Sequence, residues 1–393
     1  MNQLNNEDIN TKKSGEKKMK KVWIWLSVIL FIFVVVFVFN QTKNKQTDII
    51  IGVMTPMTGD VASWGEMQKR ATEIALQKIN SAGGIKGHKI KVVYEDDQAN
   101  PKIGVNAFKK LVEIDRVPIV VGSPASNVTL AVAPIANQIK VVLLSSGSTA
   151  TAVGQAGPYV FRIMPSDEVQ SSIMADWAKN LNYIRIAVIY EENAWGRGLM
   201  EAFTKDFLKI GGTIITIQPV DPGTTDFRNQ LTKIKSLNPD AIYAPLYTRG
   251  AGLMIKQAKE IGINQQILGA DVYGTPELIQ AGGTAVEGVL YTTFGAYHGE
   301  EYQQLAREYK EKYGIDIETY ASYCYDTFMI AIESIKRIPD GKEVSGANIR
   351  NALLSISNYN GVTGISNFNG KNSASGKTFD KMTIEGGKHV PIK

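Results

Sequence analysis

Residues 117–149 decide the fold class of this chain, and they read VPIVVGSPASNVTLAVAPIANQIKVVLLSSGST. The runs 119–121 and 141–144 are aliphatic or β-branched, as buried parallel strands require. Between them, residues 127–138 have helical length and an apolar stripe. Glycine and small hydroxyl residues follow each strand. The stretch therefore predicts a strand–helix–strand unit whose Ser/Thr/Gly loops lie at the carboxyl edge of a parallel sheet, where ligands of open α/β sheets bind.

Two hydroxyl residues of these loops, Ser126 and Thr149, are candidate donors to an anionic group of a ligand. Backbone N–H groups and the helix dipole favour an anion at the amino ends of helices. The alternative is that both residues only cap helices. The sequence of the two loops fits both interpretations equally well.

The same rhythm of strands and helices continues along the chain and restarts after residues 159–165. Strands that alternate with helices of roughly 10 to 15 residues predict βαβ units and parallel sheets. Right-handed crossovers then make each sheet doubly wound. A chain of 393 residues, 44% of them hydrophobic, suits about two such α/β domains. Helices are expected near 300–313 and 319–338, followed by a turn-rich tail.

The charge of the chain is modest, with a formal net charge of +5. Residues 1–21 contain six lysines and three acidic residues, so the remaining chain is close to neutral. It has no arginine-rich cluster or aromatic-basic stripe. Nucleic acid is therefore not an expected partner.

Residues 22–39 are eighteen consecutive residues without a charge. As a helix they span roughly 27 Å, which is close to the hydrocarbon thickness of a bilayer. No small-residue cleavage site and no cysteine for lipid attachment follows them. We predict an uncleaved transmembrane anchor, with the Lys-rich segment 1–21 cytoplasmic, residues 40–47 as a linker, and the body outside the cytoplasm. A late or atypical cleavage is the alternative.

Sequence signatures of catalysis are absent from the chain. No nucleophile elbow, P-loop or dinucleotide fingerprint follows a strand, and the three histidines have no metal-ligand spacing. The only cysteine, Cys324, lies among aromatic residues of a predicted helix and is expected in the core. Asp96 and Asp97 suit a metal site less well than a solvated turn. We therefore predict a protein that is not an enzyme and needs no metal or cofactor.

The body resembles the type I periplasmic-binding fold, specifically the branched-chain amino-acid (Leu/Ile/Val) binding proteins of ABC transporters. The resemblance covers nearly all of the body from residue 48. It rests on seven pieces in order: TPMTG at 55–59, INSAGGIKG at 79–87, YEDD at 94–97, residues 117–126, VFR at 160–162, residues 190–196 and YD at 325–326. It implies two Rossmann-like lobes, 48–163 plus 295–367 and 164–294 plus 368–393, joined by a three-segment hinge that closes over one small ligand.

The resemblance also implies the ligand-binding residues. Ser126 and Thr149 match donors to the α-carboxylate of the ligand, Gly147 and Ser148 lend their backbone, and Asp271 matches the acid that receives the ammonium group. Four aromatic residues match positions that wall the pocket: Trp64, Trp195, Tyr247 and Tyr320. Two alternatives stand beside these roles: Asp271 as a helix-capping acid before Pro276, and Tyr320 as a core residue. Trp64 and Trp195 fall in predicted turns, where core packing explains them less well.

The function implied is the extracytoplasmic solute-binding component of an ABC transporter, which binds a branched-chain or similar amino acid and delivers it to membrane permease subunits. Asp271 is one methylene shorter than the Glu of the leucine binder, and Trp195 is bulkier than the usual Tyr, so the side-chain preference stays open. One alternative is a tethered sensor ectodomain for an amino acid, amide or urea. Another is an amidase-type enzyme.

Overall fold

The computed structural model describes residue 23, residues 25–27 and 30–33, and residues 48–392. The chain forms two compact units, Met1–Asp48 and Ile49–Lys393, which are considered separately. In the first unit the described residues before 34 are helical, with exposed side chains such as Trp23. Within the described residues, none of the helices has the length and apolar character that a membrane span requires. The segment 1–21, the linker 40–47 and much of the predicted anchor 22–39 lie outside the described residues, so the anchor stays a prediction.

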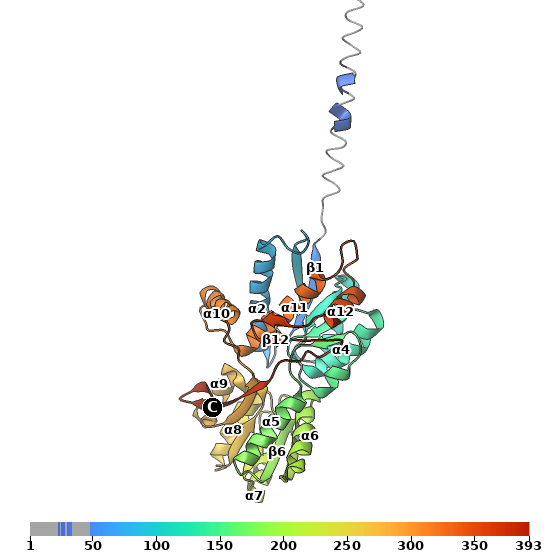
Figure 1. Ribbon diagram of the computed structural model, residues 1–393. Coiled ribbons are helices and arrows are strands. Elements are labelled where there is room, and N and C mark those ends of the chain that lie inside the picture. Colours follow the sequence, from blue (N-terminus) through green and yellow to red (C-terminus); the bar gives the residue numbers. More distant parts are fainter. Residues whose placement is uncertain (1–22, 24, 28–29, 34–47, 393) are drawn as a thin grey trace, which may run out of the picture. The chain divides into compact units, whose positions relative to one another are not determined.

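The first sheet of the larger unit has five parallel strands in the order β2-β1-β3-β4-β5. The strands are β1 (Ile49–Thr55), β2 (Ile90–Asp96), β3 (Ile119–Gly122), β4 (Val142–Ser145) and β5 (Val160–Arg162) (Figure 1). Alternate residues of a strand face opposite sides of its sheet. Val121 and Leu144 accordingly belong to one hydrophobic core, whereas Val120 and Leu143 belong to another. The predicted strand–helix–strand unit at 117–149 is confirmed.

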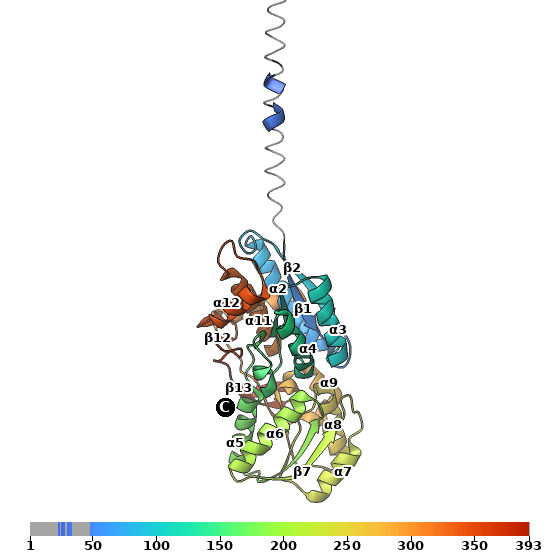
Figure 2. The same cartoon turned by 90° about the vertical axis from the view of Figure 1, so that its right-hand side faces the viewer.

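Helices cover both faces of the first sheet. One face carries α2 (Ala62–Ser81), α11 (Thr319–Lys336) and α12 (Gly346–Leu354), with α10 (Glu300–Tyr313) beside α2. The other face carries α3 (Pro101–Lys109) and α4 (Ser126–Ile139). Figure 2 shows α3 on one side of β1 and α11 and α12 on the other. We call this sheet with its helices the first lobe.

The second sheet has seven strands in the order β14-β13-β10-β9-β8-β6-β7. The strands β6 (Arg185–Glu191), β7 (Thr213–Val220), β8 (Ala241–Tyr243), β9 (Gln266–Gly269) and β10 (Leu290–Phe294) are parallel, whereas β13 (Phe379–Glu385) and β14 (Lys388–Pro391) extend the sheet antiparallel. One face carries α5 (Asp167–Asn180) and α6 (Ala194–Lys209). The other carries α7 (Arg228–Leu237), α8 (Thr248–Glu260) and α9 (Pro276–Gly282) (Figure 2). This sheet with its helices is the second lobe.

Both lobes repeat one strand topology. The order β7-β6-β8-β9-β10 of the second sheet matches β2-β1-β3-β4-β5 of the first. In each sheet the second strand along the chain lies on one side of the first strand, and the later strands lie on the other side, so the winding direction reverses beside the first strand. Loops at the carboxyl ends of the strands beside such a reversal form the crevice in which ligands of open α/β sheets bind. The topology therefore directs attention to the loops after β1, β3, β4, β6, β8 and β9.

The chain passes between the two lobes three times, after β5, after β10, and after the small hairpin of β11 (Tyr359–Gly361) and β12 (Gly364–Ser366). The passages are hydrogen-bonded to one another. Arg162 N donates to Asn372 O at 3.1 Å, which joins the first passage to the third. Gly295 N donates to Thr378 O at 2.9 Å, which joins the second to the third. The three passages therefore form one connected strip between the lobes.

Candidate ligand-binding site

One pocket, of about 610 Å³, lies where the carboxyl edges of the two sheets face each other. Both lobes contribute to its wall, which consists of Trp64, Pro124, Ser126, Gly147, Thr149, Phe294, Glu318, Thr319 and Tyr320 together with Trp195, Tyr247, Asp271, Val272, Gly274, Thr275 and Thr293. Most of these residues follow β1, β3 and β4 in the first lobe and β6, β8 and β9 in the second. The exceptions are Thr293 and Phe294, which end β10, and Glu318, Thr319 and Tyr320, which stand at the start of α11. The two topological reversals thus bring separate loops to one place.

Eight of the nine residues predicted for the site line this pocket: Trp64, Ser126, Gly147, Thr149, Trp195, Tyr247, Asp271 and Tyr320. The ninth, Ser148, is buried behind the wall. Its hydroxyl lies 2.9 Å from Thr129 Oγ1 and 3.1 Å from Ser123 O. Ser148 therefore fastens the loop after β4 to the loop after β3. The roles of all nine residues toward a ligand remain predictions.

The hydroxyls of Ser126 and Thr149 are not used as helix caps. Ala125 is the N-cap of α4, and Ala150 is the N-cap of the short 3₁₀ helix that follows Thr149. Ser126 Oγ accepts from Ala150 N at 3.3 Å, and Thr149 Oγ1 is buried without a hydrogen-bond partner. The capping interpretation is therefore wrong for both residues, and the Thr149 hydroxyl is available to a ligand.

The backbone N–H groups of Gly147 and Ser148 are already engaged. Both donate to Ser145 Oγ, at 3.3 and 2.9 Å respectively. The predicted backbone donors of this loop are thus occupied by the last residue of β4, which the sequence presents as one of the small hydroxyl residues after the strand. Gly147 has another use, because an added Cβ would lie 2.8 Å from Pro124 Cβ and 3.1 Å from the Tyr320 hydroxyl. Glycine keeps the pocket open at this point.

Three aromatic rings form a continuous wall across the two lobes. The ring of Tyr247 lies edge-on to Trp64 of the first lobe, with 5.1 Å between centroids, and 5.2 Å from Trp195 of its own lobe. These separations are typical of favourable aromatic pairs. Tyr320, at the start of α11, adds a fourth ring, and its hydroxyl lies 3.5 Å from Ser146 Oγ.

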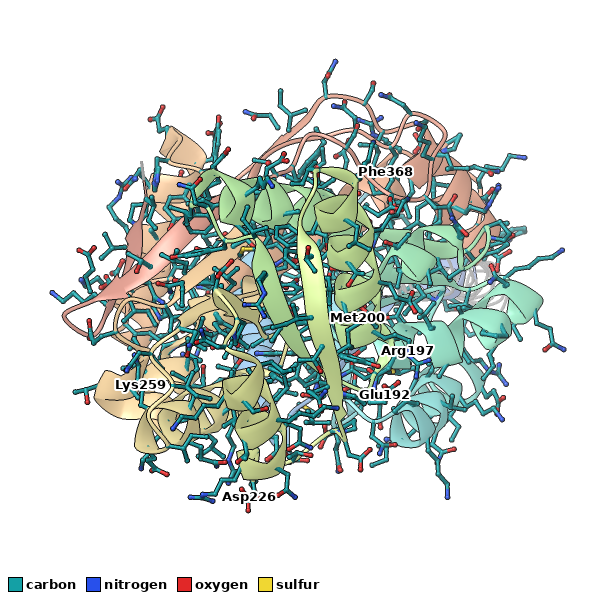
Figure 3. The ribbon with its side chains drawn as sticks, turned by 90° about the horizontal axis from the view of Figure 1, so that it is seen from below. Glu192, Arg197, Met200, Asp226, Lys259 and Phe368 are labelled. Atoms are coloured by element: carbon teal, nitrogen blue, oxygen red, sulfur yellow. The ribbon has the colours of Figure 1, made fainter. Side chains whose placement is uncertain are left out.

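Trp64 and Trp195 belong to first turns of helices, not to the loops in which they were expected. For Trp195 the local cause is clear. Asn193 caps α6 by accepting from Gly196 N at 2.8 Å, and Glu192 forms an ion pair with Arg197 one turn further on (Figure 3). Such capping starts the helix immediately after β6. The tryptophan is thereby fixed at the rim of the sheet, facing the pocket.

Asp271 is the acidic group that the second lobe contributes to the pocket wall. It begins a 3₁₀ turn after β9, is 6% exposed, and its Oδ1 has no hydrogen-bond partner. Burial raises the pKa of Asp271 to about 6, although the nearby side chains of Gln170 and Trp195 act to lower it. The residue that caps α9 is Thr275, so the helix-capping interpretation of Asp271 is wrong. A buried carboxylate with one unpaired oxygen favours a cationic ligand group.

Sequence reasoning missed a second carboxylate beside Asp271. Asp167, the first residue of α5, is 0% exposed, and neither of its oxygens has a hydrogen-bond partner. Burial, and next the charge of Asp271, raise its pKa well above the ordinary range, although the nearby Thr149 hydroxyl and the charge of Arg162 act to lower it. Gln170, one turn along α5, contributes another unpaired oxygen, Oε1. Only acidic residues at a helix start signal this cluster in the sequence, and exposed helices carry the same signal.

Glu191 is the other buried acid near the pocket that sequence reasoning missed. It ends β6, accepts from Tyr247 N at 3.1 Å and accepts from Asn193 Nδ2 at 2.8 Å. Burial raises its pKa to about 7. Through these two bonds it fixes the loop that carries the central ring of the aromatic wall.

Asp96 and Cys324, which were also considered in the sequence, lie in surroundings that indicate a structural role. Asp96 accepts from Met57 N at 2.8 Å and Gln98 N at 3.0 Å, as a turn acid does. Within residues 48–392, no group of three or more His, Cys, Asp or Glu side chains is placed to hold a metal ion. Cys324 is fully buried in the core of the first lobe, as predicted.

The chemistry of the pocket is therefore bipolar. Hydroxyls from the loops after β3 and β4 and the carboxyl of Glu318 lie on the side of the first lobe, the carboxyl of Asp271 lies on the side of the second, and aromatic rings enclose the space between them. A small molecule with an anionic end, a cationic end and an apolar part matches such a wall.

Comparison with known proteins identifies the family. The sequence model of the periplasmic binding proteins matches residues 48–388, which include both sheets. The chain belongs to the periplasmic binding protein family. The resemblance predicted from the sequence is confirmed, and with it the type I periplasmic-binding fold.

The relatives of this periplasmic binding protein are named as binding proteins. A Leu/Ile/Val-binding protein homolog 3 from Brucella melitensis is 35% identical over 62% of this chain and 67% of its own length. The crystal structure of a leucine-binding protein LivK from Thermotoga maritima matches with a TM-score of 0.80 and 31% identity over 88% of this chain and 98% of that one. A branched-chain amino acid transporter substrate-binding protein LivJ from Streptococcus pneumoniae, in complex with isoleucine, also has a TM-score of 0.80, with 25% identity over 88% and 99%.

Proposed function

We propose that this periplasmic binding protein is the extracytoplasmic solute-binding component of an ABC transporter, and that it binds one amino acid with an apolar side chain. A single observation carries the proposal. The pocket contains a buried, unpaired hydroxyl oxygen, Thr149 Oγ1, in the first lobe and a buried, unpaired carboxylate oxygen, Asp271 Oδ1, in the second. An amino-acid zwitterion pairs both, and the relatives named for leucine and for branched-chain amino acids support this choice.

Each part of the ligand has its proposed partners. The hydroxyls of Ser126 and Thr149 donate to the α-carboxylate, and Asp271, with Asp167 behind it, receives the ammonium group. Trp64, Tyr247, Trp195 and Tyr320 enclose the side chain. Hydrogen bonds to charged groups contribute about 1.5–3 kcal/mol each. A few of them with apolar burial suffice for a micromolar complex, roughly −8 kcal/mol.

Closure of the lobes on the ligand is part of the proposal. The proposed lobes, 48–163 plus 295–367 and 164–294 plus 368–393, meet at the three passages of the chain, which we take as the hinge. Donors and acceptors for the two ends of the ligand come from different lobes, so the ligand gains its full set of contacts only when the lobes are together. A ligand shifts a conformational equilibrium by such a difference in contacts.

The proposed location follows from the family and from the amino end of the sequence. We propose that residues 22–39 anchor the protein in the cell membrane with its body outside, where it passes the amino acid to ABC permease subunits. The described residues neither include this whole segment nor contain a membrane-spanning helix.

A thermal-shift screen of the purified full-length chain tests the function. The ligands are the twenty amino acids, leucinamide, the des-amino analogue 4-methylpentanoate and urea. We expect leucine, isoleucine or valine to raise the melting temperature, and leucinamide and 4-methylpentanoate to have much smaller effects. Equal stabilisation by leucine and 4-methylpentanoate would show that the pocket does not read an ammonium group, and the amino-acid proposal would fail.

A further inference from the structure

Arg162 is a buried cation directly behind the proposed carboxylate-binding loop. It is the last residue of β5 and is 4% exposed. Its Nη1 donates to Thr149 O at 2.6 Å and to Ala150 O at 2.8 Å. Two adjacent carbonyls of one loop are thus held by one nitrogen of a rigid, planar group.

The same guanidinium group reaches the third passage between the lobes. Arg162 Nε donates to Ser373 Oγ at 3.0 Å. The backbone of Arg162 adds two further bonds, because its N–H donates to Asn372 O at 3.1 Å and its carbonyl accepts from Ala374 N at 2.9 Å. One residue therefore joins the loop after β4 to a segment more than 200 positions away in the sequence.

The loop that Arg162 holds carries the ligand groups of the first lobe. Ala150 N donates to Ser126 Oγ at 3.3 Å, so the position of Ala150 also sets the orientation of the Ser126 hydroxyl. The Thr149 carbonyl accepts a second bond, from Asp167 N at 2.9 Å, at the point where the chain enters α5 of the second lobe. The arginine, the Thr149 carbonyl, the Ser126 hydroxyl and the first passage consequently share one hydrogen-bond network.

The electrostatic surroundings argue against a purely packing role. Burial lowers the pKa of Arg162, while the charges of Asp167 and Glu168 raise it. Its hydrogen bonds go to carbonyl and hydroxyl oxygens and not directly to a carboxylate. Burying a charge in this way is costly, and an apolar residue of the same size would fill the space at lower cost. The gain is a fixed geometry for the oxygens that it binds.

We propose that Arg162 is a positioning residue for the ligand carboxylate: it holds the Thr149–Ala150 backbone so that the Ser126 and Thr149 hydroxyls point at the ligand, and it ties this loop to the third passage through Ser373. The inference rests on the proposed function, because it assumes that a carboxylate binds at these hydroxyls. It assigns a role to a residue that does not line the pocket.

The test compares Arg162→Gln with a matched control, Arg185→Gln, in the full-length protein. Arg185 also donates to two backbone carbonyls, Asn238 O and Leu237 O, both at 3.1 Å. It begins β6, and the pocket lies beyond the other end of that strand. Affinities for leucine and for leucinamide, which lacks the carboxylate, are measured by titration calorimetry alongside the melting temperature.

We expect Arg162→Gln to weaken leucine binding by about tenfold or more and leucinamide binding by less than about twofold, since only the carboxylate contacts depend on the loop. Arg185→Gln should change neither affinity. Equal losses for both ligands, or no loss for leucine, would overturn the inference. If Arg162→Gln does not fold, Ser373→Ala removes only the link to the third passage and should also weaken leucine more than leucinamide; equal effects would again refute it. Failure of the unaltered protein to bind leucine would instead refute the proposed function.

Discussion

Replacing Asp271 with Asn is expected to stabilise the ligand-free protein at neutral pH while it weakens ligand binding. Asp271 is 6% exposed and Oδ1 has no partner, and burial raises its pKa from the ordinary 3.8 to about 6. A shift of about two pKa units corresponds to about 3 kcal/mol of differential interaction. Asparagine carries no charge, so the variant should gain up to about 3 kcal/mol in free energy of unfolding at pH 7.5.

The pH dependence gives the sign of this effect independently. The folded protein keeps the Asp271 proton at pH values where the unfolded chain has lost it, because the folded pKa is the higher one. The stability that the protonated Asp271 contributes is therefore complete below about pH 4 and is lost as the pH rises through about 6. The Asn variant lacks this dependence. Its advantage over the unaltered protein should be near zero at acid pH and largest above about pH 6.

Binding should respond in the opposite direction. The ammonium group of leucine needs the ionised carboxylate, so affinity should fall about tenfold per pH unit below about pH 6. In Asp271→Asn a charge-assisted hydrogen bond is lost, which costs about 1.5–3 kcal/mol or roughly 10- to 150-fold in affinity. The affinity of the variant should also be nearly independent of pH in this range.

Urea denaturation and leucine titration calorimetry, each at pH 4.5, 6.0 and 7.5, measure both effects. Asp96→Asn is a control of opposite sign. Burial acts to raise the pKa of Asp96, but hydrogen bonds from Thr58, Met57 and Gln98 lower it overall. The ionised Asp96 carboxylate therefore stabilises the folded protein at neutral pH, and this stabilisation is lost on acidification. Two results would refute this reasoning. One is an Asp271→Asn variant that is less stable than the unaltered protein at pH 7.5. The other is a leucine affinity of the unaltered protein that does not change from pH 7.5 to 4.5.

Three further predictions concern the wall of the pocket, the closed arrangement and the amino end. Gly147→Ala would place a Cβ 2.8 Å from Pro124 Cβ and 3.1 Å from the Tyr320 hydroxyl, both in the pocket wall. We expect at least about tenfold weaker leucine binding by calorimetry, and an unchanged affinity would contradict the proposed ligand position. The ion pair between Arg249 and Asp60 joins the lobes at 2.8 Å, but both side chains are about 60% exposed. Each variant that removes one of these charges should therefore weaken leucine binding by no more than about fivefold. The double variant should weaken it by no more than either single variant. If 22–39 is an uncleaved anchor, intact mass of membrane-extracted protein should include residue 1, whereas a chain starting near residue 41 would disprove it.

The strands and helices of the body were predictable because their patterns are strong. The β-branched runs at 119–121 and 141–144, separated by residues of helical length, favour buried parallel strands with a helix between them. Of the candidate wall residues, only Ser126 and Thr149 were found from the pattern of strands and loops, because the carboxyl ends of parallel strands meet at one edge. The aromatic residues and Asp271 were predicted only by the resemblance to the binding-protein family.

What escaped prediction depends on burial, which local sequence does not encode. Asp167 reads as an ordinary acid at a helix start, and only the approach of the loop that carries Asp271 makes it a buried, unpaired carboxylate. Ser145 reads as one of several small hydroxyl residues after a strand, and its hydroxyl accepts the N–H groups that were expected to serve the ligand. Trp64 was expected at the end of a turn-rich loop, whereas α2 already begins at Ala62, without a side-chain cap.

The balance of contacts across the pocket explains why an empty protein should not remain closed. The contacts between lobes that need no ligand are modest: the exposed Arg249–Asp60 pair contributes about 0–1 kcal/mol, and the edge-on Trp64–Tyr247 pair about 0.5–1.5 kcal/mol beyond its burial. Against them, each buried polar group left unpaired costs about 1–3 kcal/mol, and more when it is charged. Thr149 Oγ1 and Asp271 Oδ1 are both unpaired in this structure, which we take as the closed arrangement of the proposal. The opposing terms are therefore of similar size without ligand, and a zwitterion that pairs both oxygens shifts the balance toward closure. An apolar molecule of the same shape fills the pocket but leaves both oxygens unpaired, so shape alone is insufficient to close it.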